Sequence, residues 1–392
     1  MRISGVEVIP LYAPEAQGVK STCIVRVHTD EGVEGIGQAE IPAMIAAAFI
    51  KTREWEIAGY YQGGLERVLL GEDPLNIERL WHKMYASMWL YGRRGAGIAV
   101  MTAIDTALWD IKGKVLGKPV CELMWSACNV ARLDEDFLNT KRRVKPYATV
   151  YPSGTTPEEI KKNLQPAVEA GFQAVKIEES ENGLGRKDVR HDVELVEAAR
   201  EVLGDKRDLM IDFQYIWNDY TRAISTIKAI EPFNIYFVEA PLPPDSLEAY
   251  AMLADSVETR IACGDGGFTT RFEFKELIEK GRVDVVQPSV VRTGGITELL
   301  RIASMAFEYG KLCIPHSYAW MIGVAAEIHL AAVIPNMPYI EMPSLHPYSP
   351  LISELLIPTP TPKDGYIEVP TTPGLGFKLN EKTIEKYRVE PF

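Results

Sequence analysis

The 392-residue sequence lacks the features that mark membrane-spanning, nucleic-acid-binding and disulfide-stabilised proteins. It has no apolar run of the roughly 18–20 residues that a transmembrane helix needs, and its N-terminal segment has no apolar signal-peptide core. The net charge is −12 and basic clusters are short, which disfavours nucleic acid and anionic membranes as partners. The five cysteines are scattered and form no CxxC motif, so we expect reduced, buried thiols in a cytoplasmic protein.

What the sequence does have is a hydrophobic content of 46%, enough for a large core, and a length that predicts two domains. Residues 24–28 and 33–38 are apolar-rich strands joined by a good hairpin turn. Residues 98–116 form a helical pattern that is apolar on most sides and therefore buried. We predict an α+β domain over residues 1–130, followed by a charged linker at 132–143.

After this linker, short β-rich runs alternate with amphipathic helical segments, a pattern typical of a parallel β/α barrel. The predicted strands are residues 147–151, 174–177, 209–212, 235–238, 260–263, 283–286, 312–314 and 339–341. We therefore predict an α/β fold with a modified TIM barrel, (β/α)7β, over residues 144–350. A C-terminal segment, 351–392, is predicted to return to the N-terminal capping domain and complete it. A doubly wound open sheet is the alternative; the sequence has no GxGxxG after an early strand, which counts against its dinucleotide-binding version.

Three acidic residues end three consecutive predicted strands: Asp212 in LMIDFQ, Glu239 in YFVEAP and Asp265 in IACGDGG. Neighbouring strands of a parallel barrel end on the same face, so these carboxylates converge and repel each other unless a cation lies between them. Hard oxygen ligands favour Mg²⁺ over zinc. Each residue alone is more often a helix cap or a turn residue, but the set predicts a metal site.

The same barrel face collects other polar residues at or just past strand ends. They are Lys176, Glu178, Ser289, His316 and Glu341. Catalytic groups of β/α barrels lie at this face, so the clustering carries more information than any one residue.

With these motifs the chain resembles the enolase superfamily, and within it the mandelate racemase subgroup, over nearly its whole length. The matching segments are TDEGVEGIGQAE, AIDTALWDIKGKVLGKPV, VKIE, MIDF, VEAPLP, IACGD, VVQPSVVRTGGITE and IPH. The resemblance implies Mg²⁺ on Asp212, Glu239 and Asp265, removal of the proton α to a substrate carboxylate, and a homo-oligomer. It also implies that first-domain loops near Pro14–Thr22 and Pro42–Trp55 cover the barrel mouth and set specificity.

The resemblance also indicates which groups move protons. Relatives often carry Lys-x-Lys on the second barrel strand, with the second lysine as the base; here Glu178 replaces it, and Lys176 matches the lysine that contacts the substrate carboxylate. Glu178 is then a structural residue, a partner of Lys176 or a group near the metal. His316 is similar to the catalytic histidine of acid-sugar dehydratases, but the usual aspartate partner past the sixth strand is Ser289. A serine cannot stabilise imidazolium as a charge does.

The remaining predicted site residues follow from position. Glu341 matches the eighth-strand glutamate that hydrogen-bonds the substrate carboxylate in relatives, and we expect it to be protonated when substrate is bound. Gln214 stands where some dehydratases place an acid histidine; its amide can hold a substrate hydroxyl. Tyr151 and Arg292 are predicted pocket residues from position alone.

The leading prediction is a Mg²⁺-dependent hydro-lyase that dehydrates an acid sugar to a 2-keto-3-deoxy acid, with His316 as the base. One alternative is a racemase, epimerase or cycloisomerase, for which only Lys176 is available as a second base. The other is a metal- and carboxylate-binding protein with weak or no catalysis, which the identities of Glu178 and Ser289 motivate.

Overall fold

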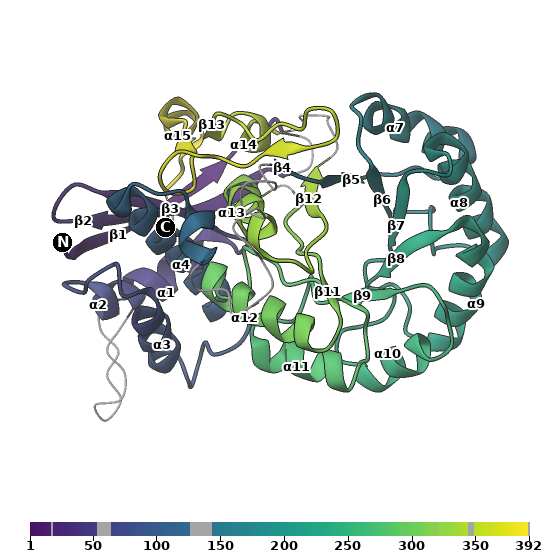
Figure 1. Ribbon diagram of the computed structural model, residues 1–392, viewed down its shortest axis with the longest axis horizontal. Coiled ribbons are helices and arrows are strands. Elements are labelled where there is room, and N and C mark those ends of the chain that lie inside the picture. The colour runs from purple at the N-terminus through teal and green to yellow at the C-terminus, as the bar shows by residue number, and fades with distance from the viewer. Residues whose placement is uncertain (17–18, 53–63, 126–142, 319, 344–348, 391–392) are drawn as a thin grey trace.

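The computed structural model (Figure 1) describes the chain in six stretches, namely residues 1–16, 19–52, 64–125, 143–318, 320–343 and 349–390. A small N-terminal domain lies beside a curled parallel sheet of eight strands whose helices cover the outside. The predicted α/β fold, with a capping domain and a TIM-type barrel, is confirmed. The predicted linker at 132–143 lies, except for its last residue, outside the described residues.

The capping domain is built on an antiparallel sheet in the order β1-β2-β3. Its elements are β1 (Ile3–Tyr12), β2 (Ser21–Thr29), β3 (Glu34–Ala39), α1 (Ala43–Lys51), α2 (Leu65–Leu69), α3 (Ile77–Ser87), α4 (Ala96–Leu116) and α5 (Val120–Trp125). The predicted hairpin is β2 and β3, and the predicted buried helix is α4. A Cβ at Gly37 would lie 1.8 Å from the carbonyl oxygen of Ala103, so glycine lets α4 pack directly on β3.

The capping segment predicted as a loop at Pro42–Trp55 is largely helical, which corrects that expectation. Helix α1 occupies residues 43–51, and residues 53–55 lie outside the described part of the chain. The sequence AMIAAAFIK is rich in alanine, the best helix former, and Ala46, Ala47 and Ile50 are buried. Local helix propensity and burial therefore agree here. Most of the other predicted loop, Pro14–Thr22, has no helix, and its last two residues belong to β2.

The barrel sheet runs in the order β11-β10-β9-β8-β7-β6-β5-β12, and every neighbouring pair is parallel. Its strands are β5 (Pro146–Val150), β6 (Ala174–Glu178), β7 (Asp208–Asp212), β8 (Ile235–Glu239), β9 (Ile261–Cys263), β10 (Val285–Val286), β11 (Leu312–Cys313) and β12 (Ile340–Pro343). Each lies where a strand was predicted, with ends that differ by at most two residues. Apolar runs bounded by helical segments are thus a sufficient strand signal in this chain.

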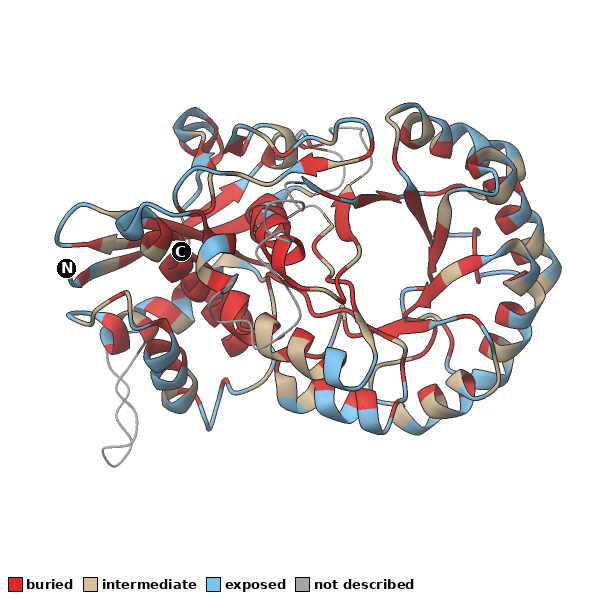
Figure 2. Ribbon diagram, viewed as in Figure 1, coloured by how far each residue is buried: buried red, intermediate tan, exposed pale blue. Residues whose placement is uncertain are grey.

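Helices follow the barrel strands and shield the sheet from solvent (Figure 2). They are α7 (Pro157–Glu169), α8 (Val189–Leu203), α9 (Tyr220–Ile230), the 3-10 turn η1 (Glu231–Phe233), α10 (Leu247–Ala254), α11 (Arg271–Glu279), α12 (Gly295–Glu308) and α13 (Met321–Val333). Most have one buried and one exposed face, whereas α13 is buried along its whole length. Among the described residues, no helix is both long and apolar enough to cross a membrane.

The C-terminal segment returns to the capping domain, as expected. It contains α14 (Pro350–Ser353), β13 (Leu356–Ile357), β14 (Ile367–Glu368), β15 (Lys378–Leu379) and α15 (Glu381–Tyr387), and β14 pairs with β4 (Arg143–Val144). Val389 donates its N–H to the carbonyl of Pro10 at 3.0 Å, and Tyr387 donates its hydroxyl to Glu15 at 2.6 Å. The boundaries at residues 130, 144 and 350 stay predictions.

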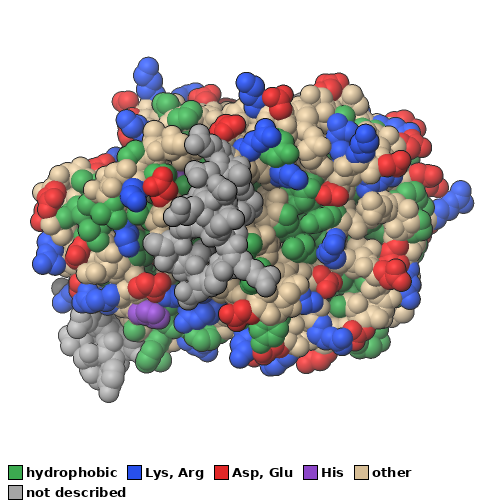
Figure 3. Space-filling model, viewed as in Figure 1, with side chains coloured by type: hydrophobic (Ala, Val, Ile, Leu, Met, Phe, Trp, Pro, Cys, Tyr) green, Lys and Arg blue, Asp and Glu red, His purple; other side chains and the backbone are tan. Residues whose placement is uncertain are grey.

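Two further observations concern the cysteines and the charged side chains at the surface. Cys23, Cys121, Cys263 and Cys313 are buried and free, and Cys128 lies outside the described residues. Acidic and basic side chains are interspersed over the face drawn in Figure 3.

Candidate active site

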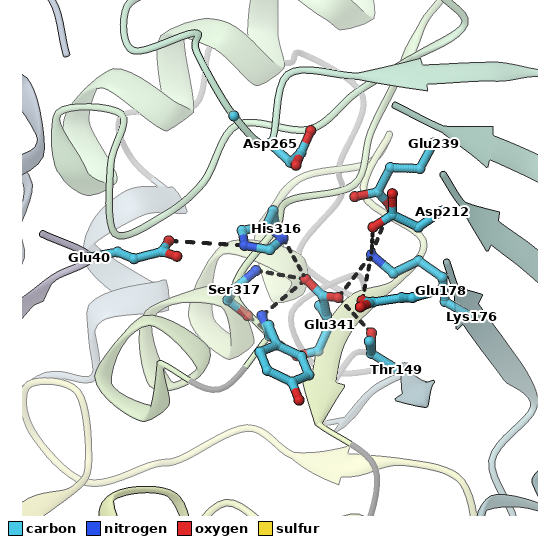
Figure 4. A network of polar contacts seen from close by, with 12 residues as sticks. Glu40, Thr149, Lys176, Glu178, Asp212, Glu239, Asp265, His316, Ser317 and Glu341 are labelled. Carbon is cyan, nitrogen blue, oxygen red and sulfur yellow. Dashed lines mark hydrogen bonds and ion pairs between the residues drawn. The ribbon is translucent and has the colours of Figure 1, made fainter. Parts of the chain in front are cut away.

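The site is built on one layer of apolar side chains that closes the barrel interior. The layer takes one residue from each strand or its end: Tyr147, Ala174, Met210, Phe237, Ala262, Val285, Ile314 and Tyr339. Side chains two residues apart on a strand point to the same face. The positions two residues beyond the layer therefore face the barrel interior toward its carboxyl end. Six of them carry the polar groups in Figure 4: Thr149, Lys176, Asp212, Glu239, His316 and Glu341.

Lys176 is the centre of this polar cluster. Its side chain is fully buried, and Nζ lies 2.8 Å from Glu239, 3.0 Å from Glu341, 3.6 Å from Asp212 and 3.9 Å from Glu178. Burial alone lowers the pKa of Lys176, but the attraction of Glu239 and Glu341 outweighs it and raises this pKa well above its usual value. The ammonium therefore stays charged and holds four carboxyl groups together.

Glu341, at the start of β12, is surrounded by donors. Oε1 accepts from Thr149 Oγ1 at 2.5 Å and lies 3.0 Å from Lys176 Nζ, while Oε2 accepts from the N–H groups of Ser317 at 2.9 Å and Tyr318 at 3.0 Å. Burial alone raises the pKa of Glu341, but Lys176 and His316 hold it well below its usual range. The carboxylate is therefore ionised in this arrangement. The protonated form expected with bound substrate requires the substrate to displace some of these donors.

His316 lies between two carboxylates. Nδ1 is 3.1 Å from Oε2 of Glu341, and Nε2 is 4.0 Å from Oε2 of Glu40. Burial alone lowers the pKa of His316, but Glu341 and Glu40 outweigh it and raise the pKa to about 10. A base must be neutral before it accepts a proton, and a cation beside Asp265 would shift this pKa downward.

Ser289 stands at the position where the resemblance predicts an aspartate partner for His316, and its hydroxyl supplies no charge. Ser289 is fully buried, and its Oγ has no hydrogen-bond partner among the described residues. That this position cannot stabilise imidazolium as a carboxylate would stays a prediction.

The three predicted metal ligands end neighbouring strands but do not form one symmetrical set. Asp212 and Glu239 are the last residues of β7 and β8, and Asp265 lies two residues past β9. Among the described residues, one group of side chains could share a metal ion. It consists of Glu239, Asp265 and His316, whose ligand atoms all lie within 4.8 Å of one another. Asp212 instead lies near Lys176 and accepts the N–H of Gln214 at 2.8 Å.

A divalent cation fits this set of donors. Oε1 of Glu239 is buried and lacks a hydrogen-bond partner within the described structure. Burial is the main cause that raises the pKa of Asp212 to about 7. The positive charge of Lys176 opposes this rise, and the negative charges of Glu178 and Asp265 add to it. Burial and the charge of Asp212 raise the pKa of Glu239 to about 8. Carboxyl groups so crowded take up protons near neutral pH unless a cation compensates them, and hard oxygen donors suit Mg²⁺.

Glu178 and Gln214 form a pair at the edge of the cluster. Gln214 Nε2 donates to Oε2 of Glu178 at 2.9 Å, and the N–H of Glu178 donates to Ser153 Oγ at 2.8 Å. Burial is the main cause that raises the pKa of Glu178 to about 7. Glu178 lies within ion-pair distance of Lys176, so the structure brings it into the network of that lysine.

Of the two residues predicted from position alone, Arg292 contacts Asp265, whereas the position of Tyr151 in the pocket stays a prediction. Tyr151 directly follows β5 and is 44% exposed. Arg292 donates through Nη1 to the carbonyl of Asp265 at 2.8 Å and through Nη2 to Glu40. Sequence reasoning missed Glu40, which ends the hairpin motif TDEGVEGIGQAE and is separated from Arg292 by most of the chain.

Two family models match the chain. The one described as "Enolase C-terminal domain-like" matches residues 159–383. The one described as "Mandelate racemase / muconate lactonizing enzyme, N-terminal domain" matches residues 11–125. Together they span both the barrel and the capping domain.

Individual relatives are similar over nearly their whole length. The chain is 32% identical to arabinonate dehydratase of Saccharolobus solfataricus over 369 residues, which cover 90% of this chain and 92% of that protein. It is 32% identical to D-galactonate dehydratase of Ralstonia nicotianae over 383 residues, covering 94% and 91%. Among solved structures, the 3,6-anhydro-D-galactonate cycloisomerase from Zobellia galactanivorans superposes with a TM-score of 0.83 and 28% identity, covering both chains fully.

Proposed function

The chain belongs to the mandelate racemase subgroup of the enolase superfamily, and on that premise we propose that it is a Mg²⁺-dependent hydro-lyase that dehydrates a sugar acid to a 2-keto-3-deoxy acid. The relatives named as arabinonate and galactonate dehydratases support this class of substrate. The observation that carries the proposal is a buried cluster in which Lys176 and His316 both contact Glu341 beside crowded carboxyl groups.

In the proposed reaction, the acidic residues at the strand ends bind the metal ion. Asp212, Glu239 and Asp265 would hold Mg²⁺, which supplies Lewis-acid stabilisation to the substrate carboxylate and to the negative charge that develops beside it. Their crowding and the unpartnered oxygen of Glu239 support this assignment.

Lys176 and Glu341 bind and orient the substrate carboxylate. The ammonium of Lys176 stays charged at neutral pH and lies 3.0 Å from Glu341, so an anionic group entering between them gains a cation at short range. His316, on the other side of Glu341, takes the proton from the carbon next to the carboxylate. The β-hydroxyl leaves with a proton as water, and the resulting enol becomes the 2-keto-3-deoxy acid.

Elimination needs a base on one side of the substrate, whereas racemisation needs one on each. The only lysine of the predicted set, Lys176, is surrounded by four carboxyl groups and keeps its proton, so it is a poor second base. This argument favours dehydration over racemisation or epimerisation.

The test is a screen of mono- and di-acid sugars with the Mg²⁺-loaded protein, in which 2-keto acids are detected with semicarbazide. We expect one class of sugar acid to give product with the wild type, and both His316→Asn and Asp212→Asn to abolish turnover. His28→Asn is the matched control, because His28 lies on β2 of the capping domain, where it contacts Glu7 and Glu34.

A negative screen would overturn the proposal if calorimetry shows that Mg²⁺ binds normally. Recovered substrates would then be analysed by NMR after incubation in D₂O. Deuterium at the carbon next to the carboxylate, with inversion, would identify an isomerase. No exchange, and no effect of His316→Asn, would identify binding without chemistry.

A further inference from the structure

Both ring nitrogens of His316 face carboxylates, and one of these carboxylates comes from the other domain. Glu341 lies on the Nδ1 side at 3.1 Å, and Glu40 lies on the Nε2 side at 4.0 Å (Figure 4). Glu40 directly follows β3 of the capping domain, whereas His316 and Glu341 belong to the barrel. The histidine therefore lies at the junction of the two domains.

Contacts across this junction fix the position of Glu40. Its N–H donates to the carbonyl of Val291 at 3.2 Å, and Oε1 accepts a hydrogen bond from Arg292. Two residues earlier, Gln38 accepts the N–H of Ile322 at 2.9 Å, at the start of α13. The end of β3 is thus attached to the loop that follows β10 and to the first turn of α13.

These contacts use the backbone and Oε1 of Glu40 but not Oε2. Oε2 is buried and has no hydrogen-bond partner among the described residues. A buried acceptor without a donor is destabilising, and more so when it is charged, unless a nearby charge compensates it. Nε2 of His316 is the cationic atom that lies within ion-pair distance of Oε2.

We propose that Glu40 is a positioning residue for His316: from the capping domain it holds the Nε2 side of the ring, so that Nδ1 faces the cluster of Lys176 and Glu341. It thereby takes the place of the acidic partner that is missing at Ser289. The assignment of Nδ1 to the reacting side rests on the proposed function, whereas the contact of Glu40 with the ring does not.

The other charged groups near the ring do not replace Glu40. Those that face His316 are Glu341, Asp265 and Glu327. Glu341 is shared with Lys176, Thr149 and two backbone N–H groups, all on the barrel side. Of the charged groups described near the ring, Glu40 is the one that comes from the capping domain, so the orientation of the ring depends on how that domain docks.

The first test needs no substrate. The full-length protein is labelled with ¹⁵N-histidine and kept in EDTA, and the ring-nitrogen signals of its six histidines are recorded by NMR. His316→Asn identifies the signals of His316. We expect Glu40→Gln to shift those signals and to leave the other five histidines unchanged.

The matched control is Glu34→Gln. Glu34 is the first residue of β3, the strand that Glu40 directly follows, and its Oε1 is 2.7 Å from Nδ1 of His28. This variant should shift the His28 signals and leave those of His316 in place. Glu40→Asp keeps the charge with a shorter side chain and should shift His316 less than Glu40→Gln does. Unchanged His316 signals in a folded Glu40→Gln variant, or in Glu40→Ala if Glu40→Gln does not fold, would overturn the proposal.

The second test uses turnover of whichever sugar acid the wild type accepts. We expect Glu40→Gln to lower kcat by about 10- to 100-fold, the usual range for a group that orients a functional residue, with KM changed by less than about 3-fold. Glu40→Asp should recover part of kcat. A rise in KM with kcat unchanged would instead make Glu40 a substrate-binding residue and would overturn the positioning role. If the wild type has no turnover, the proposed function fails, and the NMR result decides the Glu40 contact by itself.

Discussion

Replacement of Lys176 by methionine is the sharpest test of the charge network in the barrel. Methionine has a similar length and fits an apolar site, so the change removes mainly the charge. Four carboxyl groups lie within 3.9 Å of Nζ, two of them at 2.8 and 3.0 Å. Loss of one partner of a buried ion pair costs about 3–5 kcal/mol, because the remaining charge is left without compensation. We expect a loss of this size in the free energy of unfolding at high pH.

The loss should depend on pH, with a sign that follows from the pKa values. Burial already raises the pKa of Asp212 to about 7 and that of Glu239 to about 8, and removal of Lys176 raises both further. A carboxyl group whose pKa is higher in the folded state destabilises the protein above that pKa. The effect disappears as pH falls below the ordinary pKa of the unfolded chain, because both states then bind the proton. The cost of Lys176→Met should therefore be largest at pH 9 and smaller near pH 5, where Asp212 and Glu239 are protonated in the folded state but Glu341 still loses its cation.

The assay is urea unfolding of the wild type and of Lys176→Met in EDTA at both pH values. The matched control is Lys161→Met on α7, because Lys161 forms a surface ion pair with Glu201 and such pairs contribute about 0–1 kcal/mol. A loss below about 1 kcal/mol at pH 9, or an equal loss at pH 5 and pH 9, would refute the view that Lys176 compensates ionised carboxyl groups.

Three further predictions test the metal, the C-terminal segment and a buried histidine. Mg²⁺ at 100 times its Kd should stabilise the wild type by about 2.7 kcal/mol in scanning calorimetry without substrate, and Glu239→Gln should lose most of this gain. Asp110→Ala should cost about 2–3 kcal/mol in urea unfolding, because buried Asp110 accepts the N–H groups of Ile36 at 3.1 Å and Leu375 at 2.9 Å; an effect below 1 kcal/mol would contradict this. Burial lowers the pKa of His329 from 6.5 to about 4, so the unfolded chain binds the proton first and the wild type should lose about 3 kcal/mol as pH falls through that window. Unfolding curves of His329→Gln should lack that part of the pH dependence.

Much of the barrel could be predicted because its signals are local or periodic. Each strand is an apolar run beside an amphipathic helix, and the period of two residues along strands carries Lys176 and Asp212 to the same side as the apolar layer. Family motifs pointed to His316 and Glu341 because His316 lies just past one recognisable strand sequence and Glu341 lies within another. These features need no knowledge of side-chain positions.

The rest depends on distances between side chains that are far apart in sequence. Nothing near Glu40 in the sequence indicates that it approaches His316, since the contact exists only when the capping domain docks on the barrel. Spacing likewise predicted Asp212, Glu239 and Asp265 as equals. Asp212 lies 3.6 Å from Lys176 Nζ, whereas the ligand atoms within 4.8 Å of one another belong to Glu239, Asp265 and His316. Strand register brings residues to one face, but rotamers decide which oxygen atoms meet.

The two departures from the family pattern are consistent with each other once the charges are placed in space. Glu178 adds a carboxyl group beside Lys176, where relatives carry a base, and burial raises its pKa to about 7. That side of the site therefore contains a fully engaged ammonium and a glutamate paired with Gln214, and no free basic nitrogen among the described residues. Ser289 supplies no carboxylate to His316, and Glu40 places one 4.0 Å from Nε2 of the ring. The basic nitrogen that could accept a substrate proton therefore lies on the histidine side alone in the described site. One base is enough for elimination, whereas racemisation needs a base on each side of the substrate.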